Sequence, residues 1–115
     1  MSSFKNTLVQ VTRFGMGHGD EALAIKLMGN YFKLILDDNR LPKIITFYNE
    51  GVKLLTEKSP VLETLKTIEQ RGVTLVACKT CLDYYGLTDS MGVGITGTMM
   101  DIITLQTDAD KVVTL

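Results

Sequence analysis

Hydrophobic positions along the chain alternate between a strand-like and a helix-like pattern. Short runs rich in β-branched residues predict strands at residues 7–12, 43–48, 73–77 and 111–115, with a glycine-rich strand at 92–95. Between them, apolar residues at helical spacing predict helices at residues 20–36, 60–71, 80–85 and 98–105. Strands alternating with helices favour right-handed crossovers and a parallel sheet. The pattern therefore predicts an α/β fold: a three-layer α/β/α sandwich with a mostly parallel sheet of about five strands, in one domain over residues 1–115.

Capping residues mark where the predicted helices begin. An N-cap side chain accepts a hydrogen bond from a free backbone N–H of the first turn, and a capping box adds the reciprocal bond. Proline is favoured at the first helical position. The expected signals are Asp20 for the first helix, Ser59 with Pro60 for the second, and the pairs Thr80–Asp83 and Thr98–Asp101 for the last two.

The composition narrows the class of protein. Hydrophobic residues make up 45% of the chain and charged residues 22%, which excludes a disordered chain. A net charge of −1 creates no overall field that would attract a polyanion, so no nucleic-acid partner is expected. No apolar run reaches the roughly 18 residues of a membrane span. The segment Met1–Lys5 lacks the apolar core of a signal peptide, so a cytoplasmic protein with reduced thiols is expected.

Chemistry-bearing residues gather after the predicted strands. In parallel α/β sheets, ligands bind at the carboxyl ends of the strands, so the turns that follow them are the candidate site. Both cysteines and the single histidine of the chain lie in these turns. The turns are Arg13–Gly19, Asn49–Gly51, Cys78–Cys81 and Thr96–Thr98.

The segment Cys78-Lys79-Thr80-Cys81 is the most informative of these turns. Free N–H groups at the start of a helix, together with the positive charge of Lys79, favour a thiolate, which is the reactive form of cysteine. The alternative is that both cysteines are small core residues. A four-cysteine zinc site needs two such pairs, and this chain has one, so no metal is expected.

The loop Gly15-Met16-Gly17-His18-Gly19 raises the question of a phosphate site. Its spacing matches neither G-x-G-x-x-G nor a loop ending in G-K-[ST]. Asp20 and Glu21 already place negative charge at the helix start, so a tight turn with an acidic cap is the better interpretation, and no cofactor is expected. His18 is then an exposed loop residue. Its functional alternative is a proton donor or acceptor near Cys78.

Three segments resemble a known family. Residues 78–87 resemble the C-x-T-C-L-D-x-Y-G-L segment of the YedF-like branch of the DsrE/DsrF-like sulfur-transfer superfamily. Residues 49–54 are similar to its N-x-G-V-K-L segment, and residues 17–21 to its G-x-G-D-[DE] turn. The resemblance implies a small α/β subunit that forms homo-oligomers.

The resemblance also implies a function. Cys78 matches the cysteine that accepts sulfur as a persulfide, and Cys81 matches the second cysteine of the YedF-like branch, so a cytoplasmic sulfur carrier or sulfurtransferase is expected. His18, Asn49, Lys79 and Thr80 would support the site from its loops. Donor and acceptor proteins or small thiols would be the partners, a TusA-like protein among the candidates, with a link to sulfur or selenium metabolism. The alternatives are a dithiol redox protein using both cysteines and a non-catalytic oligomeric binding subunit.

The first predicted helix favours a homo-oligomer independently of the family. Its apolar residues are too many for one stripe facing a sheet, and soluble monomers rarely expose large apolar patches. Part of this helix, or the Tyr84-Tyr85 segment, is the expected contact surface. The apolar positions are 23, 24, 25, 27, 28, 31, 32, 34, 35 and 36.

Overall fold

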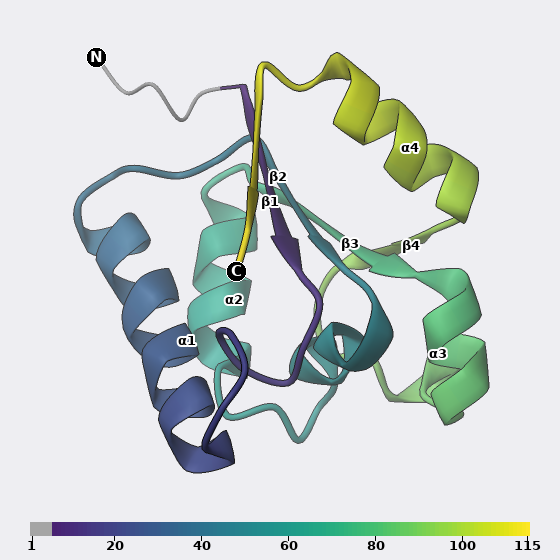
Figure 1. The fold of residues 1–115 in the computed structure, drawn as a ribbon, viewed down its shortest axis with the longest axis horizontal. Coiled ribbons are helices and arrows are strands. Elements are labelled where there is room, and N and C mark those ends of the chain that lie inside the picture. The colour runs from purple at the N-terminus through teal and green to yellow at the C-terminus, as the bar shows by residue number, and fades with distance from the viewer. Residues whose placement is uncertain (1–5) are drawn as a thin grey trace.

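Residues 6–115 are described by the structure, a computed structural model, and they contain a five-stranded sheet that is parallel throughout (Figure 1). The strand order is β4-β3-β2-β1-β5. The predicted α/β fold with a parallel sheet is confirmed. The strands are β1 (Thr7–Val11), β2 (Ile44–Phe47), β3 (Thr74–Cys78), β4 (Ile95–Gly97) and β5 (Lys111–Thr114).

The helices cover the sheet in a way that follows from the strand order. The chain moves outward from β1 to β4 and then crosses back to β5, so right-handed crossovers place the last helix on the face opposite the first two. In Figure 1, α1 and α2 lie to one side of the sheet, α4 lies to the other, and α3 follows the end of β3. The helices are α1 (Glu21–Asp37), α2 (Leu62–Gln70), α3 (Lys79–Tyr85) and α4 (Met99–Asp108), with short 3₁₀ helices η1 (Asn49–Leu55) and η2 (Thr88–Ser90).

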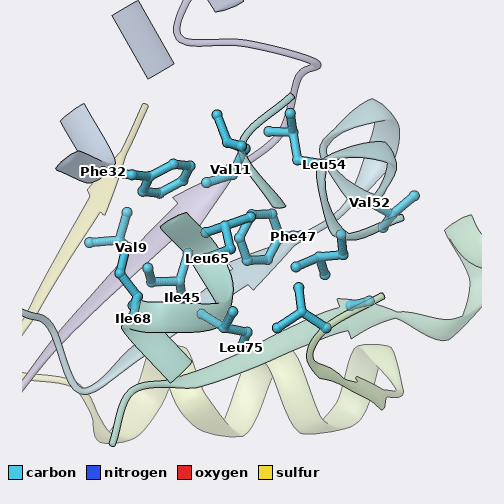
Figure 2. Packing of buried hydrophobic residues seen from close by; sticks show 14 of the residues in the cluster. Val9, Val11, Phe32, Ile45, Phe47, Val52, Leu54, Leu65, Ile68 and Leu75 are labelled. Carbon is cyan, nitrogen blue, oxygen red and sulfur yellow. The ribbon is translucent and has the colours of Figure 1, made fainter. Parts of the chain in front are cut away.

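The main core lies between the sheet and helices α1 and α2 (Figure 2). Alternate strand residues point to this face, because successive side chains of a strand point to opposite sides. Each fully buried side chain of this size contributes about 1.5–3 kcal/mol of transfer free energy. The buried residues include Val9, Val11, Ile45, Phe47 and Leu75 from the strands, and Phe32, Leu65 and Ile68 from the helices.

The opposite face of the sheet is more polar. Gln10 and Thr46 are buried side by side on β1 and β2, and the Gln10 side chain donates to Thr114 Oγ1 at 2.9 Å. Gln106 of α4 donates to Gln10 Oε1, and Ile102 is the buried apolar residue of that helix. The buried Ile102 and the amide pair of Gln106 and Gln10 therefore help to hold helix α4 over the sheet.

Two of the predicted helix starts are confirmed. The Asp20 carboxylate accepts from the backbone N–H of Leu23 at 3.0 Å, as the N-cap of α1. Thr98 and Asp101 form the predicted capping box at the start of α4, with bonds of 3.2 Å and 2.8 Å in the two directions.

The other two predicted helix starts are wrong. Helix α2 begins at Leu62, and the Ser59 hydroxyl accepts from Val61 N–H in a turn before the helix. Helix α3 begins directly after β3, at Lys79, so Thr80 already lies inside its first turn and cannot cap it. The expected partner, Asp83, bonds to other side chains instead.

Differences elsewhere have local causes. The strand expected at 92–95 lies at Ile95–Gly97, because Gly94 has a φ of 87°, which a strand does not accommodate. The 3₁₀ helix η1 follows β2 where only a turn was expected, and it buries Val52, Leu54 and Leu55. Its apolar residues do not follow the α-helical period.

Two expectations concern targeting and membrane segments. The absence of a signal peptide at Met1–Lys5 was expected from residues that lie outside those described. Within residues 6–115, no helix combines the length and the apolar character that crossing a membrane requires.

Candidate functional site

The two cysteines lie where the central strand β3 meets helix α3. Cys78 ends the strand and occupies the N-cap position of α3, and Cys81 follows in the first turn. Both are free thiols. Cys78 is only 1% exposed, whereas Cys81 is half-buried. Cys81 is therefore the more accessible thiol of the pair.

The environment of Cys81 sets its protonation. Its Sγ accepts a hydrogen bond from the backbone N–H of Asn49 at 3.0 Å, and Cys78 lies three residues earlier, at the N-cap of the same helix. Burial raises the pKa of the Cys81 thiol, the Asn49 N–H lowers it, and the neighbouring Cys78 raises it again, so the net shift is upward. Cys81 consequently keeps its proton at neutral pH.

Close packing of η1 against β1 places the Asn49 N–H. A side chain at Gly51 would put its Cβ 2.3 Å from the carbonyl oxygen of Val11, so only glycine allows this approach. Tyr48 N–H donates to the same carbonyl at 3.1 Å. Asn49 itself has a φ of 54°, a left-handed conformation that asparagine tolerates better than most residues. The Asn49 donor is thus held in position by backbone contacts.

Tyr85, which bonds to Asn49, lines a pocket of about 410 Å³. Tyr85, one helical turn after Cys81, donates from its hydroxyl to Asn49 Oδ1 at 3.4 Å. The ammonium of Lys53 lies 4.6 Å from the centre of the Tyr85 ring and 3.3 Å from the Glu50 carboxylate. The pocket is lined by Phe14, Lys53, Thr56, Lys58, Tyr85 and Leu87.

The remaining predicted site residues lie apart from the thiols. Lys79 forms an ion pair with Asp83 at 2.9 Å, and this bond, together with one from Thr88, holds the pKa of Asp83 below its usual range. Its charge is therefore directed to Asp83 and not to the cysteines, contrary to expectation. Thr80 is exposed on α3.

His18 is an exposed loop residue whose Nδ1 lies 3.4 Å from the guanidinium of Arg13. Neither residue has a hydrogen bond to a thiol within residues 6–115. The same part of the chain contains no group of three or more histidine, cysteine, aspartate or glutamate side chains that could hold a metal ion. The structure thus brings together Cys78, Cys81 and Asn49 from the predicted set.

The pocket residues were missed from the sequence. Tyr85 was assigned to packing and subunit contact, although its spacing of four from Cys81 places both on one helix face. That spacing was the available signal. Phe14, Lys53 and Lys58 come from other loops, and no spacing along the chain connects them to the cysteines.

Comparisons with known proteins agree with the fold. A model of the DsrE/DsrF-like family matches residues 5–115. The ychN protein from E. coli has a similar structure, with a TM-score of 0.71 at 22% identity, covering 96% of this chain and 99% of that one. A protein of unknown function from Methanobacterium thermoautotrophicum, MTH1491, gives 0.72 at 17% identity with the same coverage.

A third solved structure is more distant. BT1422 from Bacteroides thetaiotaomicron, also of unknown function, gives a TM-score of 0.64 at 15% identity, covering 96% of this chain and 95% of that one. None of the curated proteins matches this sequence. At these identities the structural likeness shows the fold alone.

Proposed function

The chain belongs to the DsrE/DsrF-like family, which is associated with sulfur relay, and we propose that it is a sulfur carrier holding sulfane sulfur as a persulfide on Cys78. The observation that carries the proposal is the placement of two free thiols at the carboxyl end of the interior parallel strand β3, one on its last residue and one in the first turn of α3. This edge is where α/β sheets place their ligands.

The different surroundings of the two thiols support different roles. A thiolate is the nucleophile in sulfur exchange, and the proposal gives this role to Cys78, with Cys81 as the more accessible partner. Because Cys78 is buried, a persulfide formed there would be open only to a donor or acceptor thiol that approaches past Cys81. Cys81, being accessible, is the residue through which donor and acceptor would reach the pair.

The reaction divides into two exchanges. The Cys78 thiolate attacks the outer sulfur of a persulfide R–S–SH; the S–S bond breaks, R–S⁻ leaves, and Cys78–S–SH remains. An acceptor thiolate then attacks that outer sulfur, takes it as a persulfide, and restores the Cys78 thiolate. Alternatively, a Cys81 thiolate attacks the inner sulfur, releasing HS⁻ and forming a Cys78–Cys81 disulfide.

The finer assignments belong to this proposal. Residues 78–87 favour the YedF-like branch, and with it a link to sulfur or selenium metabolism and a TusA-like protein as a candidate partner. A cytoplasmic location follows from the need to keep both thiols reduced.

The test is intact mass after incubation with a stoichiometric amount of glutathione persulfide. Wild-type protein and Cys81→Ala are expected to gain one sulfur atom, and Cys78→Ala to gain none. An adduct that survives in Cys78→Ala, or no adduct in any form, would contradict the carrier role. Circular dichroism of each variant controls for folding.

A dithiol redox protein is the second candidate, and the placement of both free thiols at the start of α3 favours it specifically. Titration against glutathione buffers separates the candidates. A well-defined potential in the cytosolic range without persulfide uptake supports the redox protein. Thiols that react with neither donor nor oxidant in the native state would instead favour a non-catalytic binding subunit.

We also propose a homo-oligomer. Helix α1 leaves Leu23, Leu27 and Leu34 exposed by 53%, 41% and 64%, and Tyr84 on α3 is 83% exposed. Apolar side chains left in water at this scale favour association. Light scattering at micromolar concentration is expected to give a multiple of 12.7 kDa, whereas a monomer mass would refute the proposal.

A further inference from the structure

We propose that the pocket lined by Tyr85, one helical turn after Cys81, binds a small organic thiol or persulfide carrying a carboxylate. The role of this ligand as sulfur donor or acceptor rests on the proposed function, whereas its binding does not. The pocket has a volume of about 410 Å³, within the range of small-molecule sites. Its wall comes from three places: the loop after β1, the η1 segment with the residues after it, and the end of α3.

Two contacts connect the pocket to the accessible thiol. Tyr85 lines the pocket and lies four residues after Cys81, so the two side chains share one face of α3, one turn apart. Asn49 contacts both of them, through its backbone N–H to Cys81 Sγ at 3.0 Å and its side-chain oxygen to the Tyr85 hydroxyl at 3.4 Å. A ligand held against Tyr85 would extend its other end past Asn49 toward Cys81, which does not itself line the pocket.

The charge of the lining selects an anion. Lys53 and Lys58 are the charged residues of the wall, and no carboxylate lines it. Lys58 is exposed and has no ion pair within residues 6–115. Lys53 pairs with Glu50 at 3.3 Å, but both side chains are more than a third exposed, and such pairs are weak. Both ammonium groups can therefore bind an incoming carboxylate.

The apolar side chains of the lining favour a ligand with a carbon skeleton. Phe14, Tyr85 and Leu87 are half-buried, and the face of the Tyr85 ring already attracts the Lys53 ammonium. Inorganic sulfide would leave these apolar surfaces uncovered. A matching ligand has a carboxylate to pair with the two lysines and a short carbon chain to pack on Phe14, Tyr85 and Leu87. Its sulfur is at the other end of the chain, toward Cys81.

In the exchange, such a ligand R–S–SH gives its outer sulfur to the cysteine thiolate and leaves as R–S⁻. In the reverse reaction R–S⁻ attacks the outer sulfur of the cysteine persulfide, takes it as R–S–SH, and restores the cysteine thiolate. Both directions conserve charge and need no external oxidant.

The test measures thiol access and requires no sulfur transfer. In Cys78→Ala, Cys81 is the single thiol, and its rate of modification is measured with anionic sulfonatoethyl methanethiosulfonate and cationic trimethylammonioethyl methanethiosulfonate. The anion-to-cation rate ratio is expected to be about tenfold higher in the folded protein than in the urea-unfolded protein. Adding Lys53→Met and Lys58→Met should return the ratio to the unfolded value. Adding Lys33→Met and Lys66→Met, which remove the same charge elsewhere, should leave it high.

A second measurement tests whether binding requires the carboxylates of the ligand. S-methylglutathione, which has carboxylates but no free thiol, should slow alkylation of Cys81 by neutral iodoacetamide, and its diethyl ester should not. Equal rate ratios in folded and unfolded protein, an unchanged ratio in the pocket variant, or equal protection by acid and ester would overturn the proposal. Because persulfide uptake enters neither assay, failure of the carrier role would be seen separately.

Discussion

Replacing Gly51 with alanine should destabilise the protein strongly for a purely steric reason. The added Cβ would lie 2.3 Å from the carbonyl oxygen and 2.9 Å from the carbonyl carbon of Val11, both rigid backbone atoms. Relief requires η1 and the end of β1 to separate, which costs about 1–3 kcal/mol as overpacking. It also weakens the bond from Tyr48 N–H to that carbonyl, worth about 1 kcal/mol. The expected loss is about 3 kcal/mol.

Thermal and urea unfolding followed by circular dichroism measure this loss. For 115 residues the unfolding entropy is about 0.24 kcal/mol/K, so 3 kcal/mol corresponds to a fall in Tm of about 12 °C. Gly29→Ala is the matched control. Gly29 lies inside α1, where a new Cβ would meet only Val61 Cγ1 at an ordinary 3.8 Å. Alanine there should stabilise the helix by about 0.5–1 kcal/mol.

The two substitutions add the same methyl group, and their effects are expected to have opposite signs. If Gly51→Ala changed the free energy of unfolding by less than 1 kcal/mol, η1 would not pack tightly against β1. The placement of the Asn49 N–H on the Cys81 sulfur would then lose its structural basis.

Three further predictions concern the cysteine site. Asn49→Ala should lower the free energy of unfolding in urea by about 1 kcal/mol, because alanine is strained at the positive φ of this position. Asn49→Gly keeps the backbone donor without that strain and should lower it less. Equal losses in the two variants would refute the strain argument. The rate of Cys81 alkylation, followed by mass spectrometry, should rise with pH around a midpoint above that of an ordinary thiol. In Cys78→Ala the midpoint should fall, because one cause of the raised pKa is removed, and an unmoved midpoint would contradict the coupling. Lys79→Met should raise the pKa of Asp83, observed by NMR titration, while the Cys81 alkylation rate stays unchanged; a slower rate would mean that the lysine charge acts on the thiols.

The helix caps that could be predicted from the sequence depend on residues close together along the chain. The Asp20 cap and the Thr98–Asp101 capping box depend on residues three apart and were read correctly. Thr80 has the same spacing to its partner, but β3 continues directly into α3, so Cys78 takes the N-cap position and Thr80 falls inside the first turn. A capping signal therefore fails where a strand and a helix meet without a loop.

The sequence predicted only the site residues that short motifs or strand ends identify. The spacing of Cys78 and Cys81 located the thiols, and the rule for strand ends brought Asn49 to the same edge. The hydrogen bond between Asn49 and Cys81 depends on the close approach of Gly51 to β1, a contact between distant segments. The pocket likewise combines the loop after β1, the η1 segment and the end of α3, so its cationic character appears only in the folded chain.

The most direct test of the carrier role follows the fate of the outer sulfur. Wild-type protein is loaded with glutathione persulfide labelled with radioactive sulfur at its outer position, freed of donor, and mixed with unlabelled glutathione. A carrier transfers the label to glutathione as a persulfide and returns with both Cys78 and Cys81 as free thiols. Label released as sulfide, with a Cys78–Cys81 disulfide left on the protein, would contradict the carrier and identify a dithiol redox protein.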